Sequence, residues 1–301
     1  MKQGWAKLWF LLKNTTKEFI SDNGLTLSAS LSYYTIFSLP PLLIVIIAIF
    51  DFFFGPDAVR GELFGQIKGI VGNATAAEIQ DMIKNVRLSN STIFATVFGA
   101  AILLIGASGI FAEMQTSINY IWGIEAKPKR GLAKFLKNRL MSVSMIGSVG
   151  FLLLVGLIIN ALMDVLDSHL VNYFPGITVY LFYVLNILSV FLIITVLFTI
   201  IFKTLPDGTI SMKDSIIGAI FTSLLFMLGK FLIGAYIVGS HIASVYGAMG
   251  SIILILVWVY YSSIILYFGA EFTKVYAHKH GQKIIPNEYS VQTQKGKNSG
   301  E

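Results

Sequence analysis

The stretch that decides the fold runs from Thr178 to Phe202 and reads TVYLFYVLNILSVFLIITVLFTIIF, without a single charged side chain. A helix needs about 20 mainly apolar residues to cross the hydrocarbon core of a bilayer. The residues do not alternate between apolar and polar, as the strands of a membrane barrel would. This segment therefore predicts a transmembrane α-helix, and with it an integral membrane protein of the all-α class.

The composition of the whole chain agrees with that prediction. Of its 301 residues, 55% are hydrophobic and 13% are charged, and the mean hydropathy is +0.74. A soluble domain carries about 25% charged residues. So few charges cannot cover the surface of a soluble protein of this size, which excludes a soluble enzyme and a disordered chain. Cysteine is absent, so disulfides and cysteine-based metal or redox sites are excluded.

The hydropathy pattern predicts a membrane domain over residues 24–274 with six transmembrane helices. Residues 1–23 predict a basic amphipathic helix that lies on the inner leaflet, because apolar side chains recur there at helical spacing among lysines. The outer loop between the first two spans predicts short amphipathic helices, and residues 275–301 predict a polar tail. The six predicted spans are 26–54, 92–122, 140–163, 178–202, 215–238 and 247–270.

The distribution of basic residues predicts the orientation. Of the 22 lysines and arginines, 17 lie in the N-terminal segment, the loops after the second and fourth spans, and the C-terminal tail. Cytoplasmic segments of membrane proteins carry this excess. Both termini are therefore expected in the cytoplasm, and the net charge of +6 is read as orientation and lipid contact rather than nucleic-acid binding.

Ionisable residues inside a span are functional candidates by default, and three residues inside or at the end of a span are selected: Glu113, Lys230 and Glu271. Lys230 lies about 22 Å above the cytoplasmic start of its span, and Glu113 about 31 Å below the outer start of its own. An ion pair between these two is therefore not expected. The alternatives are a lysine that snorkels to the outer interface and carboxylates that form interfacial ion pairs.

Polar and aromatic residues mark parts of three spans. Gln115 and Asn119 belong to an unusually polar half-span that is buried in protein, lines a wet cavity, or has already left the core. Two consecutive prolines kink the first span, which fits either a gate or a static bend. The predicted path or gate residues are Glu113, Gln115, Asn119, Lys230, Glu271, Tyr33, Tyr34, Pro40, Pro41, Trp258 and Tyr260.

Two further sets of residues are predicted to have other roles. Small residues of the sixth span allow close helix packing, and basic residues after the second span suit anionic lipid headgroups. The packing residues are Gly247, Gly250, Ser251 and Gly269, and the headgroup residues are Lys127, Lys129, Arg130 and Arg139. The four histidines show no metal-ligand spacing, and no nucleotide-binding or nucleophile motif occurs. Neither a catalytic residue nor a cofactor is expected.

Several of these segments carry a family resemblance. They are Ala29–Tyr34 with Ser38 and Pro40, Asn119–Gly123, Tyr246–Ser251, Trp258–Tyr260 and Gly269–Glu271. Together they resemble the YihY/BrkB family of bacterial inner-membrane proteins, over residues 17–274. The resemblance implies six spans with both ends inside. It also implies a role in moving or organising a lipid or another amphiphile of the cell envelope.

Three functions are weighed. The favoured one is a transporter or flippase of an amphiphile whose identity the sequence does not give. The alternative is a non-transporting scaffold for an envelope-assembly partner. A membrane-bound ribonuclease, a label that the family once carried, is disfavoured because the chain has no paired-histidine metal motif and no soluble domain. Anionic lipids are expected partners on the cytoplasmic side, nucleic acid is not, and homo-oligomerisation is left open.

Overall fold

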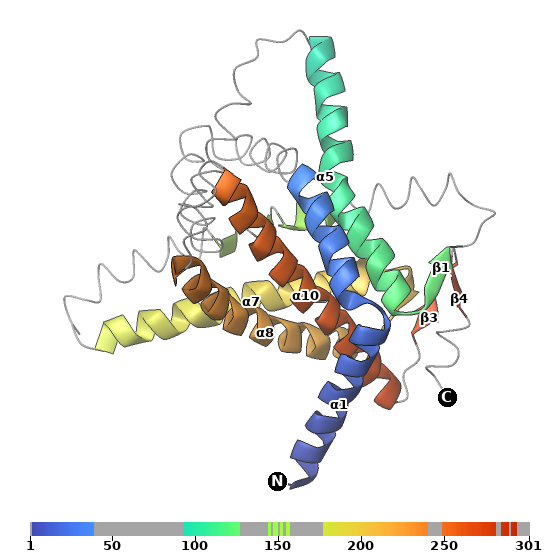
Figure 1. Cartoon of the computed structure of the whole chain (residues 1–301), viewed down its shortest axis with the longest axis vertical. Helices are drawn as coiled ribbons and strands as arrows, with labels where there is room; N and C mark the ends of the chain where they lie inside the picture. Colours follow the sequence, from blue (N-terminus) through green and yellow to red (C-terminus); the bar gives the residue numbers. More distant parts are fainter. Residues whose placement is uncertain are drawn as a thin grey trace.

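The computed structural model describes a mainly helical chain (Figure 1). The described residues are 2–38, 93–126, 177–239, 249–280, 284–288 and 290–293, with short helical pieces between 144 and 156. Residues 24–38 are helical. The other elements, in chain order, are α1 (Lys2–Ser21), α5 (Ile93–Ile121), β1 (Ile124–Ala126), α7 (Ile177–Thr204), β2 (Gly208–Thr209), α8 (Met212–Gly239), α10 (Met249–Lys279), β3 (Ile285–Pro286) and β4 (Ser290–Gln292).

Three of the described helices contain segments long and apolar enough to cross a membrane: Val184–Thr204, Met212–Lys230 and Ile255–Lys279. They overlap the fourth, fifth and sixth predicted spans, and α5 overlaps the second. The chain is thus a multi-pass membrane protein. The outer loop and most of the third predicted span lie outside the described residues. The presence of six spans and the cytoplasmic location of both termini therefore stay predictions.

Helix α8 packs against both α7 and α10, and two glycine–threonine pairs bring α8 and α10 close together. A Cβ atom at Gly218 would lie 1.9 Å from Thr273 Oγ1, and one at Gly269 would lie 2.0 Å from Thr222 Oγ1. Each threonine hydroxyl donates to the carbonyl of the glycine four residues before it, at 2.7 Å. The two helices therefore meet at a distance that only glycine permits at these two positions.

Helix α1 packs along the C-terminal part of α10 (Figure 1). Its buried positions Leu11, Thr15 and Phe19 follow helical spacing, and the Phe19 ring meets the Phe268 ring edge-on at 5.6 Å. The chain then turns at Asn23, whose φ of 53° is the left-handed conformation that ends a helix. One stripe of the predicted surface helix thus contacts protein rather than lipid.

The tail contains more structure than the sequence suggested. Helix α10 continues to Lys279, and two short strands follow. β4 pairs antiparallel with β1 after α5, and β3 pairs antiparallel with β2 between α7 and α8. Ile124 in β1 and Ile284, which directly precedes β3, are buried. Because the tail buries apolar side chains there, it ties together the ends of α5, α7 and α8.

Candidate functional site

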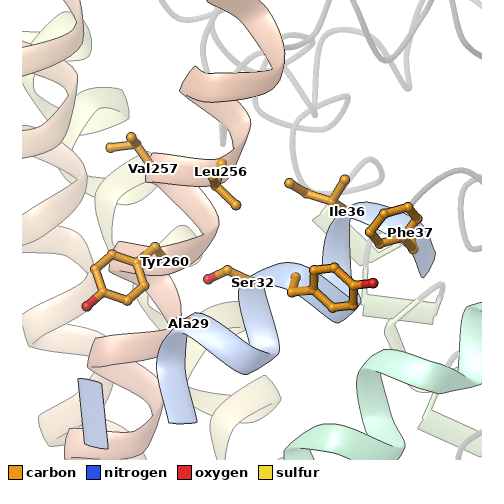
Figure 2. Close-up of a pocket in the computed structure, with 8 residues that line it drawn as sticks. Ala29, Ser32, Ile36, Phe37, Leu256, Val257 and Tyr260 are labelled. Atoms are coloured by element: carbon orange, nitrogen blue, oxygen red, sulfur yellow. The ribbon is translucent and has the colours of Figure 1, made fainter. Parts of the chain in front are cut away.

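An apolar pocket lies between residues 24–38 and α10 (Figure 2). Its volume is about 530 Å³, within the range of about 300–1,000 Å³ that is typical of pockets for small organic ligands. The lining is almost wholly aliphatic and aromatic. The lining residues are Ala29, Ser32, Tyr33, Ile36, Phe37, Leu256, Val257 and Tyr260.

Helical spacing explains how residues 24–38 form one wall of this pocket. The lining positions recur every three or four residues, which places them on one face of the helix. Ser28 and Ser32 donate their hydroxyl protons to the carbonyls of Gly24 and Ser28, each at 2.7 Å. Because these hydroxyls are satisfied within the helix, they leave the pocket apolar in character.

The pocket lies within an apolar length of α10. Tyr260 belongs to the candidate span Ile255–Lys279. It precedes Glu271 by 11 residues, which corresponds to about 16 Å along a helix axis. The predicted sixth span ends directly before Glu271, and the hydrocarbon core is about 30 Å thick. A pocket about 16 Å from that end would lie near the middle of the core, among the acyl chains.

A carboxylate of α5 contacts the helix that forms one wall of the pocket. Ser30 Oγ donates to Glu113 Oε1 at 2.6 Å, and Ser30 lies next to Ala29 and one turn before Tyr33. Glu113 is half-buried on α5. The structure therefore joins the predicted path residue Glu113 to the helix that forms the pocket wall.

The predicted aromatic residues take different places. Tyr33 and Tyr260 line the pocket, whereas Tyr34 is exposed and meets the Tyr33 ring edge-on at 5.8 Å. Trp258 is buried, and its ring packs against the rings of Phe226 and Tyr261. Of these four predicted residues, the pocket thus contains Tyr33 and Tyr260.

The remaining predicted residues are spread over the molecule. Lys230 is half-buried on α8, Gly250 and Ser251 lie in the first turn of α10, and Gly269 packs against Thr222. Seven predicted residues lie outside the described residues: Pro40, Pro41, Gly247, Lys127, Lys129, Arg130 and Arg139.

Gln115 and Asn119 bind a buried aspartate that the sequence did not single out. Asn119 Nδ2 donates to Asp207 Oδ2 at 2.9 Å, and the Asp207 backbone N–H donates to Asn119 Oδ1 at 2.8 Å. Gln115 Nε2 donates to Asp207 Oδ1 at 3.4 Å. From the tail, Ser290 Oγ donates to the Asp207 carbonyl at 2.7 Å. These two amides thus hold the turn between α7 and α8, and through it the tail, against α5.

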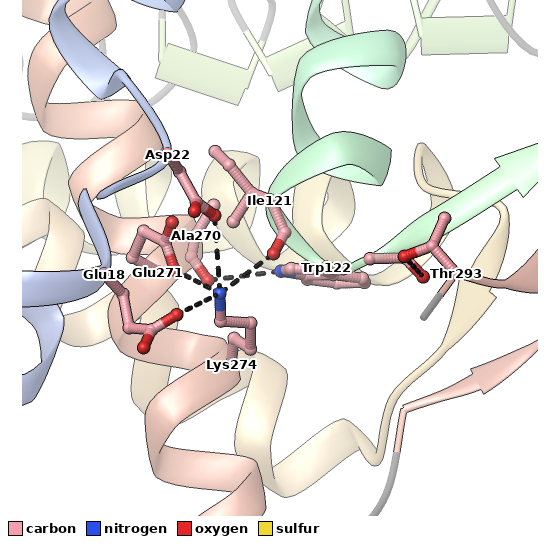
Figure 3. A network of polar contacts seen from close by, with 9 residues as sticks. Glu18, Asp22, Ile121, Trp122, Ala270, Glu271, Lys274 and Thr293 are labelled. Carbon is pink, nitrogen blue, oxygen red and sulfur yellow. Dashed lines mark hydrogen bonds and ion pairs between the residues drawn. The ribbon is translucent and has the colours of Figure 1, made fainter. Parts of the chain in front are cut away.

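Four ionisable side chains meet where the end of α1 crosses α10 (Figure 3). We call Glu18, Asp22, Glu271 and Lys274 the acid–lysine cluster. Lys274 Nζ lies 2.8 Å from Glu271 Oε2, 3.2 Å from Glu18 Oε2 and 3.6 Å from Asp22 Oδ2. It also donates to the Ile121 carbonyl at 2.9 Å. The cluster therefore connects α1, α5 and α10.

Sequence reasoning included Glu271 among the path residues but missed its partners. Lys274 was counted only as an orientation charge of the tail, yet it is buried. The spacing of Glu271 and Lys274, three residues apart at the end of a span, was a usable signal because such pairs meet on one helix face. The contact with Asp22 had no such signal, because that residue lies at the other end of the chain.

The comparison with known protein families gives one match, which covers most of the chain. Residues 15–291 match the family model described as Virulence factor BrkB. No solved structure matches the chain.

Several curated proteins are similar over most of this chain. A UPF0761 membrane protein of Saccharophagus degradans is 28% identical over 267 residues, which cover 88% of this chain and 59% of that protein. One of Alcanivorax borkumensis is 23% identical, with 95% and 64% covered, and one of Aliivibrio fischeri is 25% identical, with 91% and 84% covered. The chain thus spans about three fifths of the length of the first two relatives.

Proposed function

The chain belongs to the Virulence factor BrkB family, and from this membership and the pocket we propose that it binds a lipid or similar amphiphile and moves it across the bacterial inner membrane. The relatives are named as membrane proteins, which supports the location and leaves the activity to be argued from the site. The protein acts in this proposal as a transporter or flippase with six spans and both termini in the cytoplasm, and not as an enzyme.

The observation that carries the proposal is the pocket between residues 24–38 and α10. An apolar cavity of about 530 Å³ at the depth of the acyl chains suits the chain of a lipid better than a soluble, polar solute. Tyr33, Phe37 and Leu256 on its wall are exposed, so an apolar ligand can reach the pocket sideways from the bilayer. Burial of apolar ligand surface contributes about 25 cal/mol per Å².

The polar group of an amphiphile needs partners beside this apolar wall. Ser30, on the helix that forms the pocket wall, and Glu113, its hydrogen-bond partner on α5, provide a hydroxyl and a carboxylate. In the proposal, the predicted basic loop between the second and third spans recruits anionic headgroups from the inner leaflet. A headgroup that crosses the hydrocarbon core needs polar protein groups along its path, because acyl chains offer no hydrogen-bond partners.

The experiment that tests the binding step is native mass spectrometry of the purified protein with added phospholipid. Ala29→Trp inserts an indole into the pocket from its wall, and we expect it to abolish the retention of lipid that the wild type shows. Leu25→Trp is the matched control, since Leu25 is exposed one turn earlier on the same helix and does not line the pocket. Equal lipid retention by Ala29→Trp and the wild type would contradict the proposal.

A non-transporting scaffold is the alternative outcome. Such a protein would retain lipid in the same assay, yet vesicles that contain it would show no movement of lipid between leaflets. Copurification of one stoichiometric partner protein would then identify the scaffold function in place of transport.

A further inference from the structure

The acid–lysine cluster lies apart from the pocket, and three of its four side chains are almost completely shielded from solvent, whereas Glu18 is 34% exposed. Glu271 is 0% exposed, Asp22 1% and Lys274 3%. One carboxylate oxygen from each of Glu18, Asp22 and Glu271 lies within 4.8 Å of the others. Three carboxyl groups thus surround one ammonium group. If all four groups were ionised, the cluster would contain three negative charges and one positive charge, and burial of that excess charge would be costly.

The hydrogen-bond donors of Lys274 do not extend to all three carboxyl groups. An ammonium group has three N–H donors. Its three short contacts are with Glu271 Oε2 at 2.8 Å, the Ile121 carbonyl at 2.9 Å and Glu18 Oε2 at 3.2 Å. Asp22 Oδ2 lies at 3.6 Å, which is beyond hydrogen-bond distance. The lysine therefore stabilises Glu271 and Glu18 directly and Asp22 only at longer range.

One carboxylate oxygen of Asp22 lies within 4.8 Å of one of Glu271, and Glu271 Oε1 is buried without a hydrogen-bond donor among the described residues. An ionised carboxylate only accepts hydrogen bonds, so a hydrogen bond between two carboxyl groups requires a proton on one of them. Two adjacent carboxylates also oppose the ionisation of both. From α5, the cluster receives the carbonyl of Ile121, another acceptor that supplies no positive charge.

We propose that Asp22 and Glu271 share one proton and form a buried proton-binding site. With that proton in place, the cluster contains two negative charges and one positive charge instead of three and one. The site joins the turn after α1 to α10, the helix that also lines the pocket. Its use as the coupling site of a transporter rests on the proposed function, whereas the presence of the proton does not.

Infrared difference spectroscopy of the full chain in phospholipid nanodiscs tests this inference without any transport substrate. We expect a carbonyl band of a protonated carboxyl group near neutral pH that shifts in D₂O and disappears at alkaline pH. Asp22→Asn and Glu271→Gln should each abolish the band. Both should fold, because the amide N–H can donate to the remaining carboxylate in place of the shared proton.

Glu113→Gln is the matched control, since it removes a carboxyl group outside the cluster and should leave the band intact. The wild-type pH titration needs no variant, so it decides the question even if a variant fails to fold. Absence of the band in the wild type, or its persistence in both cluster variants, would overturn the inference. Stabilisation of the wild type against heat by sodium, with no such band, would also overturn it, because the site would then bind a metal cation.

Discussion

Replacement of Lys274 by methionine is expected to destabilise the protein strongly. The change keeps most of the apolar stem but removes the cation that lies 2.8 Å from Glu271 and 3.6 Å from Asp22. Removal of one partner from a buried ion pair costs about 3–5 kcal/mol, because the other charge stays buried without compensation. Glu18 is 34% exposed, so loss of its contact adds at most about 1 kcal/mol.

Unfolding of the purified protein in detergent, followed by circular dichroism, measures this cost. Lys17→Met is the matched control, because Lys17 is an exposed lysine of α1, and we expect it to change the unfolding free energy by less than about 0.5 kcal/mol. Addition of Asp22→Asn and Glu271→Gln to Lys274→Met should restore much of the lost stability. A Lys274→Met protein as stable as the wild type would refute the reasoning about buried charge.

Two further predictions concern packing and the tail. Gly269→Val places a Cβ atom 2.0 Å from Thr222 Oγ1 and should destabilise the protein by about 1–3 kcal/mol or more. Gly147→Ala is the control, because nothing lies within 4 Å of the added atom, and it should leave the unfolding free energy unchanged in the same assay. Asp207→Ala leaves the half-buried Asn119 amide and the buried Gln115 amide without their carboxylate partner, which costs about 1–3 kcal/mol. It should accelerate backbone amide exchange in the strands of the tail. Unchanged exchange in that variant would show that this aspartate does not hold the tail.

Helix positions could be predicted from the sequence, because runs of apolar residues report burial in lipid directly. The segment from Thr178 to Phe202 lies inside α7, and α8 and α10 overlap their predicted spans. The tail strands were missed because each contains only two or three residues, which is too short for an alternating pattern. Their stability comes from pairing with distant segments rather than from local sequence.

The candidate site could be predicted only in part. Tyr33 and Tyr260 were selected as aromatic residues within spans, and both line the pocket. The hydrogen bonds of Asn119 to Asp207 and the contact of Asp22 with Lys274 depend on how helices pack, and a single sequence read by itself contains no record of that packing. Local spacing shows which residues share a helix face, but not which other helix lies against that face.

Transport of lipid in proteoliposomes tests the central claim most directly. Vesicles with a fluorescent phospholipid in both leaflets, treated with a reductant that bleaches only the outer leaflet, report movement between leaflets. We predict bleaching of both leaflets with the wild type and with Leu25→Trp, and bleaching of the outer leaflet alone with Ala29→Trp. Lipid movement by Ala29→Trp at the wild-type rate, or none by the wild type for any envelope lipid supplied, would contradict the claim that the pocket between residues 24–38 and α10 carries lipid across the membrane.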